Sequence, residues 1–175
     1  AATPYIRNIF LQINKNTIDV NNYPLTEEII DLEFFKNKRK PNEYVISYVG
    51  AISKERGIFE VLKAIEGTNI KLHLAGVVSP QNLLKTLEKE EGWKNVVYFG
   101  NISRSEVCAL LSNAQAGICS LYPTARFLNS IPTKIFEYMS AGLPLVVSKF
   151  PYWEELLRGA DNAVFVDPLN PEDIR

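Results

Sequence analysis

From residue 43 onward the sequence alternates short β-branched or aromatic runs with amphipathic runs of helical spacing. The extended runs are EYVISYVG (43–50), IKLHLAG (70–76), VVYFG (96–100), AGICS (116–120), LPLVVS (143–148) and NAVFVD (162–167). Helical stretches of roughly ten residues separate them, and such connections form right-handed crossovers between parallel strands. The alternation therefore predicts a doubly wound α/β fold, a parallel sheet covered by helices on both faces.

Helix start signals follow two of these strands. Ser79 is the expected N-cap of a helix with Pro80 in its first turn. Ser103 and Glu106 form a capping box, in which each side chain can satisfy a backbone donor of the other residue. We therefore expect one helix to begin after each of these caps.

The charge balance argues against nucleic acid as a partner. The 175 residues include 19 Lys and Arg against 20 Asp and Glu, so any anionic ligand must be held locally. Cys108 and Cys119 lack the paired spacing of a metal site or a disulfide framework, and we expect both to be reduced core residues. With no charged-then-apolar leader and no apolar run of roughly 20 residues, the expected location is the cytoplasm.

The first 40 residues differ from the rest and are rich in Asn and Lys. TPYIRNIFLQI (3–13) predicts a helix, NTIDVNNYP (16–24) a short strand with a turn, and KNKRKPNE (36–43) a solvated linker. We expect residues 1–40 to be the tail of a preceding domain with an interdomain linker. Residues 41–175 are then one Rossmann-like domain truncated at its C-terminus, because Asn170 and Pro171 start a helix that the sequence barely begins.

In doubly wound folds the ligand binds beyond the carboxyl ends of the strands. GAISKERG (50–57) places Gly50 and Ala51 at such an end, with Arg56 before a helix start where a phosphate would be favoured. Gly76 and Gly100 also follow strands directly and would let a base or ribose approach the backbone. A solvated turn is the alternative for the first loop, and an ordinary turn for each glycine.

The stretch NSIPTKIFEYMSAGLPLVVS (129–148) carries the most chemistry. We expect a helix from Pro132 to Gly142, with Ile135, Phe136 and Met139 facing the core and Thr133, Lys134, Glu137 and Tyr138 on or near the opposite face. Free N–H groups of its first turn, near Pro132 and Thr133, would favour an anion together with Lys134. Glu137 can accept hydrogen bonds from two vicinal hydroxyls, as on a ribose, whereas a surface pair with Lys134 is the alternative.

Four segments resemble a known family in order and spacing. They are YVGAISKERGIFEVLKAI, LHLAG, VVYFGNISRSEVCALLSNAQAGICSLYP and IPTKIFEYMSAGLPLVVS. Together they are similar to the C-terminal half of the family 4, GT-B glycosyltransferases (group 1 glycosyltransferases) that build cell-surface polysaccharides of the capsule or O-antigen type. The resemblance covers residues 44 to 168, and PTKIFEYMSAGLP is its most specific part.

The resemblance implies a retaining glycosyltransferase whose nucleotide-sugar donor binds in this domain, with no metal and no separate cofactor. It makes Glu137 the ribose ligand, as the second acid of the family's E-x7-E motif, and gives Arg56 and Lys134 the catalytic role of stabilising charge on the leaving diphosphate. The remaining donor-site residues are Gly50, Ala51, Gly76, Gly100, Asn129, Pro132 and Thr133. A glycan or lipid-linked acceptor would bind through the N-terminal domain. The full-length protein could also contact the inner face of the cell membrane peripherally.

Two positions depart from the family pattern. Asn129 stands where the first acid of E-x7-E falls, and Ala51 stands where the family's usual Arg follows the first Gly. Asn129 can still hydrogen-bond a sugar hydroxyl, and Arg56 with Lys134 remains to hold the phosphates. Two other functions stay open: half of a nucleotide-sugar 2-epimerase, which would need further carboxylates and a His in the crevice, and a noncatalytic doubly wound module that binds a protein.

Overall fold

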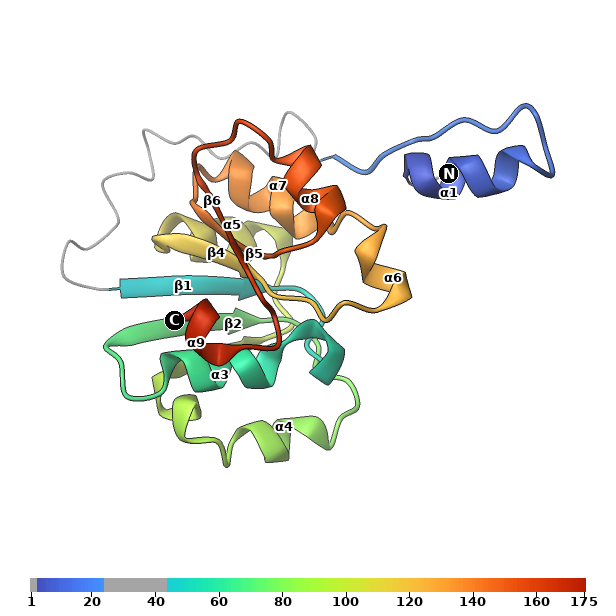
Figure 1. Cartoon of the computed structure of the whole chain (residues 1–175). Coiled ribbons are helices and arrows are strands. Elements are labelled where there is room, and N and C mark those ends of the chain that lie inside the picture. Colours follow the sequence, from blue (N-terminus) through green and yellow to red (C-terminus); the bar gives the residue numbers. More distant parts are fainter. Residues whose placement is uncertain (1–2, 24–43) are drawn as a thin grey trace.

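A six-stranded sheet forms the centre of the molecule (Figure 1). The computed structural model describes residues 3–23 and 44–175. All strands are parallel, in the order β3-β2-β1-β4-β5-β6. Their bounds are β1 Tyr44–Val49, β2 Ile70–Ala75, β3 Val96–Gly100, β4 Ala116–Cys119, β5 Leu145–Ser148 and β6 Ala163–Val166. The order changes direction between β1 and β4, which is the doubly wound Rossmann-like topology, so the predicted fold class is confirmed.

Helices cover both faces of the sheet, as the alternation predicted (Figure 1). On one face lie α5 (Arg104–Ser112), α7 (Thr133–Ser140) and α8 (Pro151–Leu156), and on the other α3 (Ile58–Ile65), α4 (Leu83–Leu87) and α9 (Pro171–Ile174). Alternate residues of β1 serve two cores: Val45 and Val49 pack under the first layer, and Tyr48 packs under the second. The connections between these elements contain η2 (Lys54–Arg56), η3 (Glu91–Asn95) and α6 (Ala125–Leu128).

Two of the predicted helix starts are confirmed in detail. At α5 the Ser103 hydroxyl accepts from the Glu106 backbone N–H and the Glu106 carboxylate accepts from the Ser103 N–H, as a capping box requires. At α9 the Asn170 side chain accepts from the Glu172 N–H at 3.1 Å, and Pro171 is the first helical residue. Among the described residues, none of the helices combines the length and the apolar character that a membrane span requires.

The start predicted at Ser79 is wrong, because α4 begins only after Asn82. The backbone N–H of Ser79 donates to the Ile52 carbonyl at 2.9 Å. This bond extends the parallel pairing beyond the ends of β1 and β2, where Ile52 bridges to Val78. Ser79 therefore remains part of an extended segment and cannot act as the first cap of a helix.

The core face predicted for α7 is also wrong in part. Lys134, Ile135 and Tyr138 are buried, whereas Met139 is 38% exposed. The Tyr138 ring packs onto β4 at Gly117, where an added Cβ would lie 2.4 Å from the ring. The missing side chain at Gly117 makes the space that an aromatic residue of α7 fills, which moves the buried face of the helix by part of a turn.

The N-terminal segment contains the predicted helix and lacks the predicted strand. α1 (Pro4–Leu11) begins after Thr3, whose hydroxyl accepts from the Ile6 N–H. Residues 17–23 form no strand, and both residue 24 and the predicted linker at 36–43 lie outside the described residues. The segment contacts the domain where the Tyr23 ring meets the half-buried Phe136 edge-on, with centroids 4.8 Å apart.

The loop from β1 to α3 passes close to the end of β4, and a glycine permits this approach. Gly57 has φ +71°, and a Cβ there would lie 2.0 Å from the carbonyl oxygen of Ser120. Only glycine combines that backbone conformation with so close a contact. The loop is thereby held over the switch point of the sheet, which is the place between β1 and β4 where the strand order changes direction. Arg56 directly precedes Gly57 in this loop.

Candidate functional site

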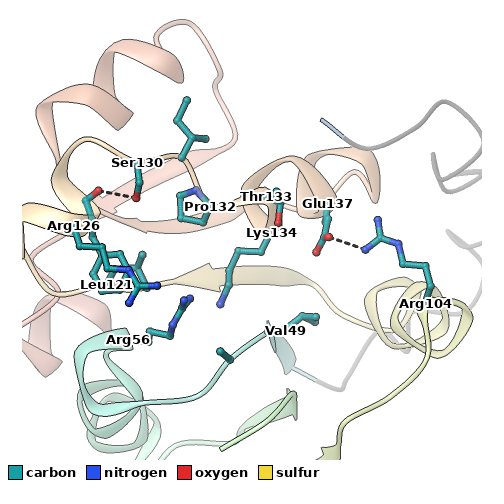
Figure 2. Close-up of a pocket in the computed structure, with 14 residues that line it drawn as sticks. Val49, Arg56, Arg104, Leu121, Arg126, Ser130, Pro132, Thr133, Lys134 and Glu137 are labelled. Carbon is teal, nitrogen blue, oxygen red and sulfur yellow. Dashed lines mark hydrogen bonds and ion pairs between the residues drawn. The ribbon is translucent and has the colours of Figure 1, made fainter. Parts of the chain in front are cut away.

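A pocket of about 460 Å³ opens beyond the carboxyl ends of β1 and β4, where the strand order changes direction (Figure 2). Its walls come from the loop after β1, the start of α5, the segment around α6 and the first turns of α7. The lining residues are Val49, Gly50, Ala51, Arg56, Arg104, Leu121, Arg126, Phe127, Ser130, Ile131, Pro132, Thr133, Lys134 and Glu137. Four of them are cations and one is a carboxylate, so the pocket suits an anion.

Lys134 is the buried cation of this pocket. Its side chain is 6% exposed, and its Nζ forms no hydrogen bond with any described residue. The Nζ lies 3.9 Å from the centre of the Tyr48 ring, a cation–π contact, and the stem passes Gly50. Burial lowers the pKa of Lys134 to about 8, and the positive charge of Arg56 acts in the same direction. A buried ammonium without an oxygen partner is costly, and an anion in the pocket would relieve that cost.

Arg56 and Arg126 both line the pocket beside the same aromatic ring. The Cζ of each guanidinium is 5.4 Å from the centre of the Phe127 ring. The buried Tyr48 hydroxyl fixes the loop that carries Arg56, because it lies 3.1 Å from the Ala51 carbonyl oxygen and 3.2 Å from that of Arg56. Neither guanidinium forms an ion pair with a described carboxylate. Both are therefore available to an anionic ligand.

Glu137 forms an ion pair that the sequence did not predict. The Nη1 of Arg104 donates to Oε1 of Glu137 at 2.6 Å, which joins α5 to α7, and the Glu137 side chain is 16% exposed. The surface pair with Lys134, considered as the alternative, is not formed. The other carboxylate oxygen, Oε2, accepts no hydrogen bond within the described segments. Glu137 is thus an oriented carboxylate with one oxygen left to accept from a ligand hydroxyl.

The structure brings most of the predicted site residues together. Gly50, Ala51, Arg56, Pro132, Thr133, Lys134 and Glu137 all line the pocket. Pro132 is the N-cap of α7, one position before the first helical residue. Arg104 and Arg126 complete the pocket and were missed by the sequence analysis, although both follow strand ends, in SRSE and in PTARF. Their position in the first turn of a helix that follows a strand end was the one signal that could have found them.

Three predicted donor residues do not line this pocket. Asn129 is half-buried at the end of α6, where its carbonyl accepts from the Thr3 hydroxyl at 3.3 Å. Gly76 lines a second, smaller pocket of about 230 Å³ beside Tyr98, at the ends of β2 and β3. Gly100 lines neither pocket, and its carbonyl accepts from the Gly76 N–H at 2.7 Å. The roles predicted for these three residues therefore stay predictions.

Both cysteines are free, as predicted. Cys119 is buried, and this burial raises the pKa of its thiol to about 11, whereas Cys108 is half-buried. Within residues 3–23 and 44–175, no group of three or more His, Cys, Asp and Glu side chains is arranged to hold a metal ion.

Comparisons with known proteins identify the family. The family model described as glycosyl transferases group 1 matches residues 29–175. The chain belongs to this family. An uncharacterized glycosyltransferase of Methanocaldococcus jannaschii is 27% identical over 139 residues, which are 76% of this chain and 34% of that protein. The group 1 glycosyltransferase chain thus spans about a third of the length of this relative.

Solved structures share the fold of this group 1 glycosyltransferase chain. A glycosyltransferase from Rickettsia africae has a TM-score of 0.78 at 13% identity, over 99% of this chain and 50% of that one. Anabaena HepE, solved in complex with UDP and glucose, has a TM-score of 0.70 at 17% identity, again over 99% and 50%. These likenesses confirm the fold class as one Rossmann-like half of a GT-B fold.

Proposed function

We propose that this chain is the C-terminal, donor-binding domain of a retaining, family 4 type glycosyltransferase. The full-length enzyme transfers a sugar from a nucleotide diphosphate donor to a glycan or lipid-linked acceptor in the synthesis of a cell-surface polysaccharide of the capsule or O-antigen type. One observation carries the proposal: the buried ammonium of Lys134 has no oxygen partner in a pocket at the switch point of the sheet. HepE, which has the same fold, was solved in complex with UDP and glucose, and this supports a nucleotide sugar as the ligand class.

The diphosphate of the donor binds between Lys134 and Arg56. Lys134 supplies a charge from α7, and Arg56 supplies a guanidinium from η2 in the loop after β1. The first turn of α7 adds backbone N–H groups at Thr133 and Lys134 that have no partner within the helix. Ala51 brings no charge to this site, so Lys134 supplies the second cation for the diphosphate.

The ribose of the donor binds at Glu137. Arg104 holds one carboxylate oxygen at 2.6 Å, and the other can accept from the ribose hydroxyls. The base lies beyond the ribose, toward the ends of β2 and β3. There Gly76 and Gly100 keep their predicted role of letting a flat ring approach the backbone.

The same cations assist the chemical step. When the bond between the sugar C1 and the β-phosphate oxygen breaks, its electron pair stays on the phosphate. The acceptor hydroxyl oxygen forms the new bond to C1, and its proton passes to the leaving phosphate. Charge therefore grows on the leaving phosphate, next to Arg56 and Lys134. Fixed donors stabilise that charge in the transition state more than in the bound donor, which lowers the barrier.

The rest of the enzyme lies in a preceding domain. We assign residues 1–40 to the tail of that domain and the interdomain linker, and residues 41–175 to the donor domain. Exposed apolar residues of the N-terminal segment, Ile9, Phe10, Ile13 and Ile18, are the kind of surface that a preceding domain would cover. The acceptor binds mainly through that domain, and the enzyme acts in the cytoplasm at the inner face of the cell membrane. We expect the present chain alone to bind nucleotide without turnover.

Isothermal titration of the chain with UDP, GDP and ADP tests the proposal. We expect one of the three to bind, and Arg56→Ala to weaken it about tenfold or more, since charge-assisted bonds to phosphate are lost. Lys54→Ala is the matched control, because Lys54 is an exposed cation of the same loop that does not line the pocket. No binding of any of the three at millimolar concentration, or equal losses for the two variants, would refute the donor site.

A further inference from the structure

Arg126 is a cation of the pocket that the binding of nucleotide leaves unused. It belongs to α6, is exposed, and stacks against Phe127, with its Cζ 5.4 Å from the ring centre. It forms no ion pair with a carboxylate of the described segments. The stacking holds the guanidinium at the pocket wall, where it faces the open space.

The labelled side chains follow an order along the pocket (Figure 2). Arg104 and Glu137 lie at one end, Lys134 lies next, and the nitrogen ends of Arg56 and Arg126 point toward the space beyond it. A nucleotide sugar has the same linear order of ribose, diphosphate and sugar. With the ribose at Glu137 and the diphosphate at Lys134 and Arg56, the sugar itself lies nearest Arg126.

The charges of the nucleotide leave one cation of the pocket unmatched. Among the described residues that line the pocket, Glu137 is the one carboxylate, and it pairs with Arg104. Each phosphate of the donor carries one negative charge, and these two charges match Lys134 and Arg56. Arg126 then remains as a positive charge beside the sugar. A guanidinium binds a phosphate or a carboxylate through two parallel hydrogen bonds, and with both phosphates matched elsewhere a carboxylate on the sugar is the partner left for Arg126.

We propose that the donor sugar is a sugar acid, whose carboxylate is bound by Arg126. This inference rests on the proposed donor site and adds the chemical class of the transferred sugar, a uronic acid or a related carboxylated sugar. A neutral hexose would leave the guanidinium facing hydroxyl groups, which do not neutralise its charge. The carboxylate of such a donor also meets no unpaired carboxylate among the described residues that line the pocket.

Pairs of donors that differ only at C6 test the proposal. The chain is titrated with UDP-glucose against UDP-glucuronate, and with GDP-mannose against GDP-mannuronate. For the base that the chain accepts, we expect the acid to bind about tenfold tighter than the neutral sugar, and Arg126→Gln to remove this preference by weakening the acid about tenfold more than the neutral donor. Arg126→Glu should reverse the preference, because a carboxylate would then face a carboxylate.

Arg158→Gln is the control. It removes an exposed guanidinium that is paired with Glu155 away from the pocket, and it should leave both affinities unchanged. Equal or tighter binding of the neutral donor would overturn the sugar-acid assignment and leave the donor site intact. Equal losses for both donors in Arg126→Gln would also overturn it, because Arg126 would then serve the diphosphate. Failure of every nucleotide to bind would overturn the donor site and this inference together.

Discussion

The ammonium of Lys134 lies 3.9 Å from the centre of the Tyr48 ring and has no oxygen partner among the described residues, although both side chains are buried. A cation–π contact compensates only part of the cost of burying a charge. The arrangement lowers the stability of the folded chain while preparing a binding site for an anion.

Lys134→Met should change stability and binding in opposite directions. Met keeps the length of the stem and removes the buried charge, so the free energy of unfolding should rise by about 1 to 3 kcal/mol at neutral pH. Affinity for the accepted nucleotide should fall about tenfold or more, because the phosphate loses a charge-assisted bond. Urea unfolding and calorimetry measure the two effects, with the exposed Lys149→Met as control. A destabilised variant with unchanged affinity would show that Lys134 is merely structural.

The pKa of Lys134 predicts how stability depends on pH. The folded chain loses this proton near pH 8, whereas the unfolded chain keeps it up to the ordinary value of 10.5. Between these values the unfolded state binds more protons, so the free energy of unfolding rises with pH. The difference in that free energy, wild type minus Lys134→Met, should therefore increase by about 3 kcal/mol across the window. The difference is obtained from urea titrations at several pH values, and a constant difference would contradict the lowered pKa.

Glu137→Ala should reduce recognition of the ribose. The carboxylate is oriented by Arg104 and leaves one oxygen for the ligand hydroxyls, so its loss should cost about 1.5 to 3 kcal/mol of binding free energy. The ribonucleotide should be weakened more than its 2′-deoxy form, because the deoxy form lacks one of the two hydroxyls. Glu88→Gln, at an exposed position of the end of α4, is the control. Equal losses for the two nucleotides would assign Glu137 a role other than ribose binding.

Gly57→Ala and Gly67→Ala separate backbone strain from crowding. The two glycines have nearly equal φ angles, +71° and +70°, but an added Cβ meets the Ser120 carbonyl oxygen at 2.0 Å in the first and nothing within 4 Å in the second. Gly67→Ala should cost about 1 to 2 kcal/mol for the left-handed conformation alone. Gly57→Ala should cost about 1 to 3 kcal/mol more, since the end of β4 must shift. Equal midpoints of urea unfolding would mean that the contact at Gly57 is easily relieved.

The sheet could be predicted from the sequence because each strand and helix has a recognisable pattern within its own residues. Runs such as YVISYV and caps such as the Ser103–Glu106 box need no distant residue to be recognised. The buried face of α7 could not be predicted in this way. Tyr138 is buried because Gly117, on a strand distant in sequence, leaves room for its ring. Such complementarity between elements is absent from the periodicity of either one.

The candidate site likewise contains residues that could be predicted from local sequence and residues that could not. The residues of the strand-end loops and of α7 were found because the fold dictates where ligands bind. The partner of Glu137 was not, because Arg104 reaches it from another helix, 33 positions earlier in the sequence. Arg126 was missed for a similar reason: α6 is too short to show a periodic pattern. Contacts between residues of separate helices can be identified only from the structure.

The most direct test of the donor site is the pKa of Lys134 itself, measured with and without the accepted nucleotide. NMR of the chain labelled at lysine Cε follows this side chain through a pH titration, and the signal missing from Lys134→Met identifies it. Without ligand, we expect a pKa near 8. With the nucleotide bound, the phosphate should favour the charged form and raise the pKa by about one unit or more. A pKa that is the same in both titrations would contradict a diphosphate bound at Lys134.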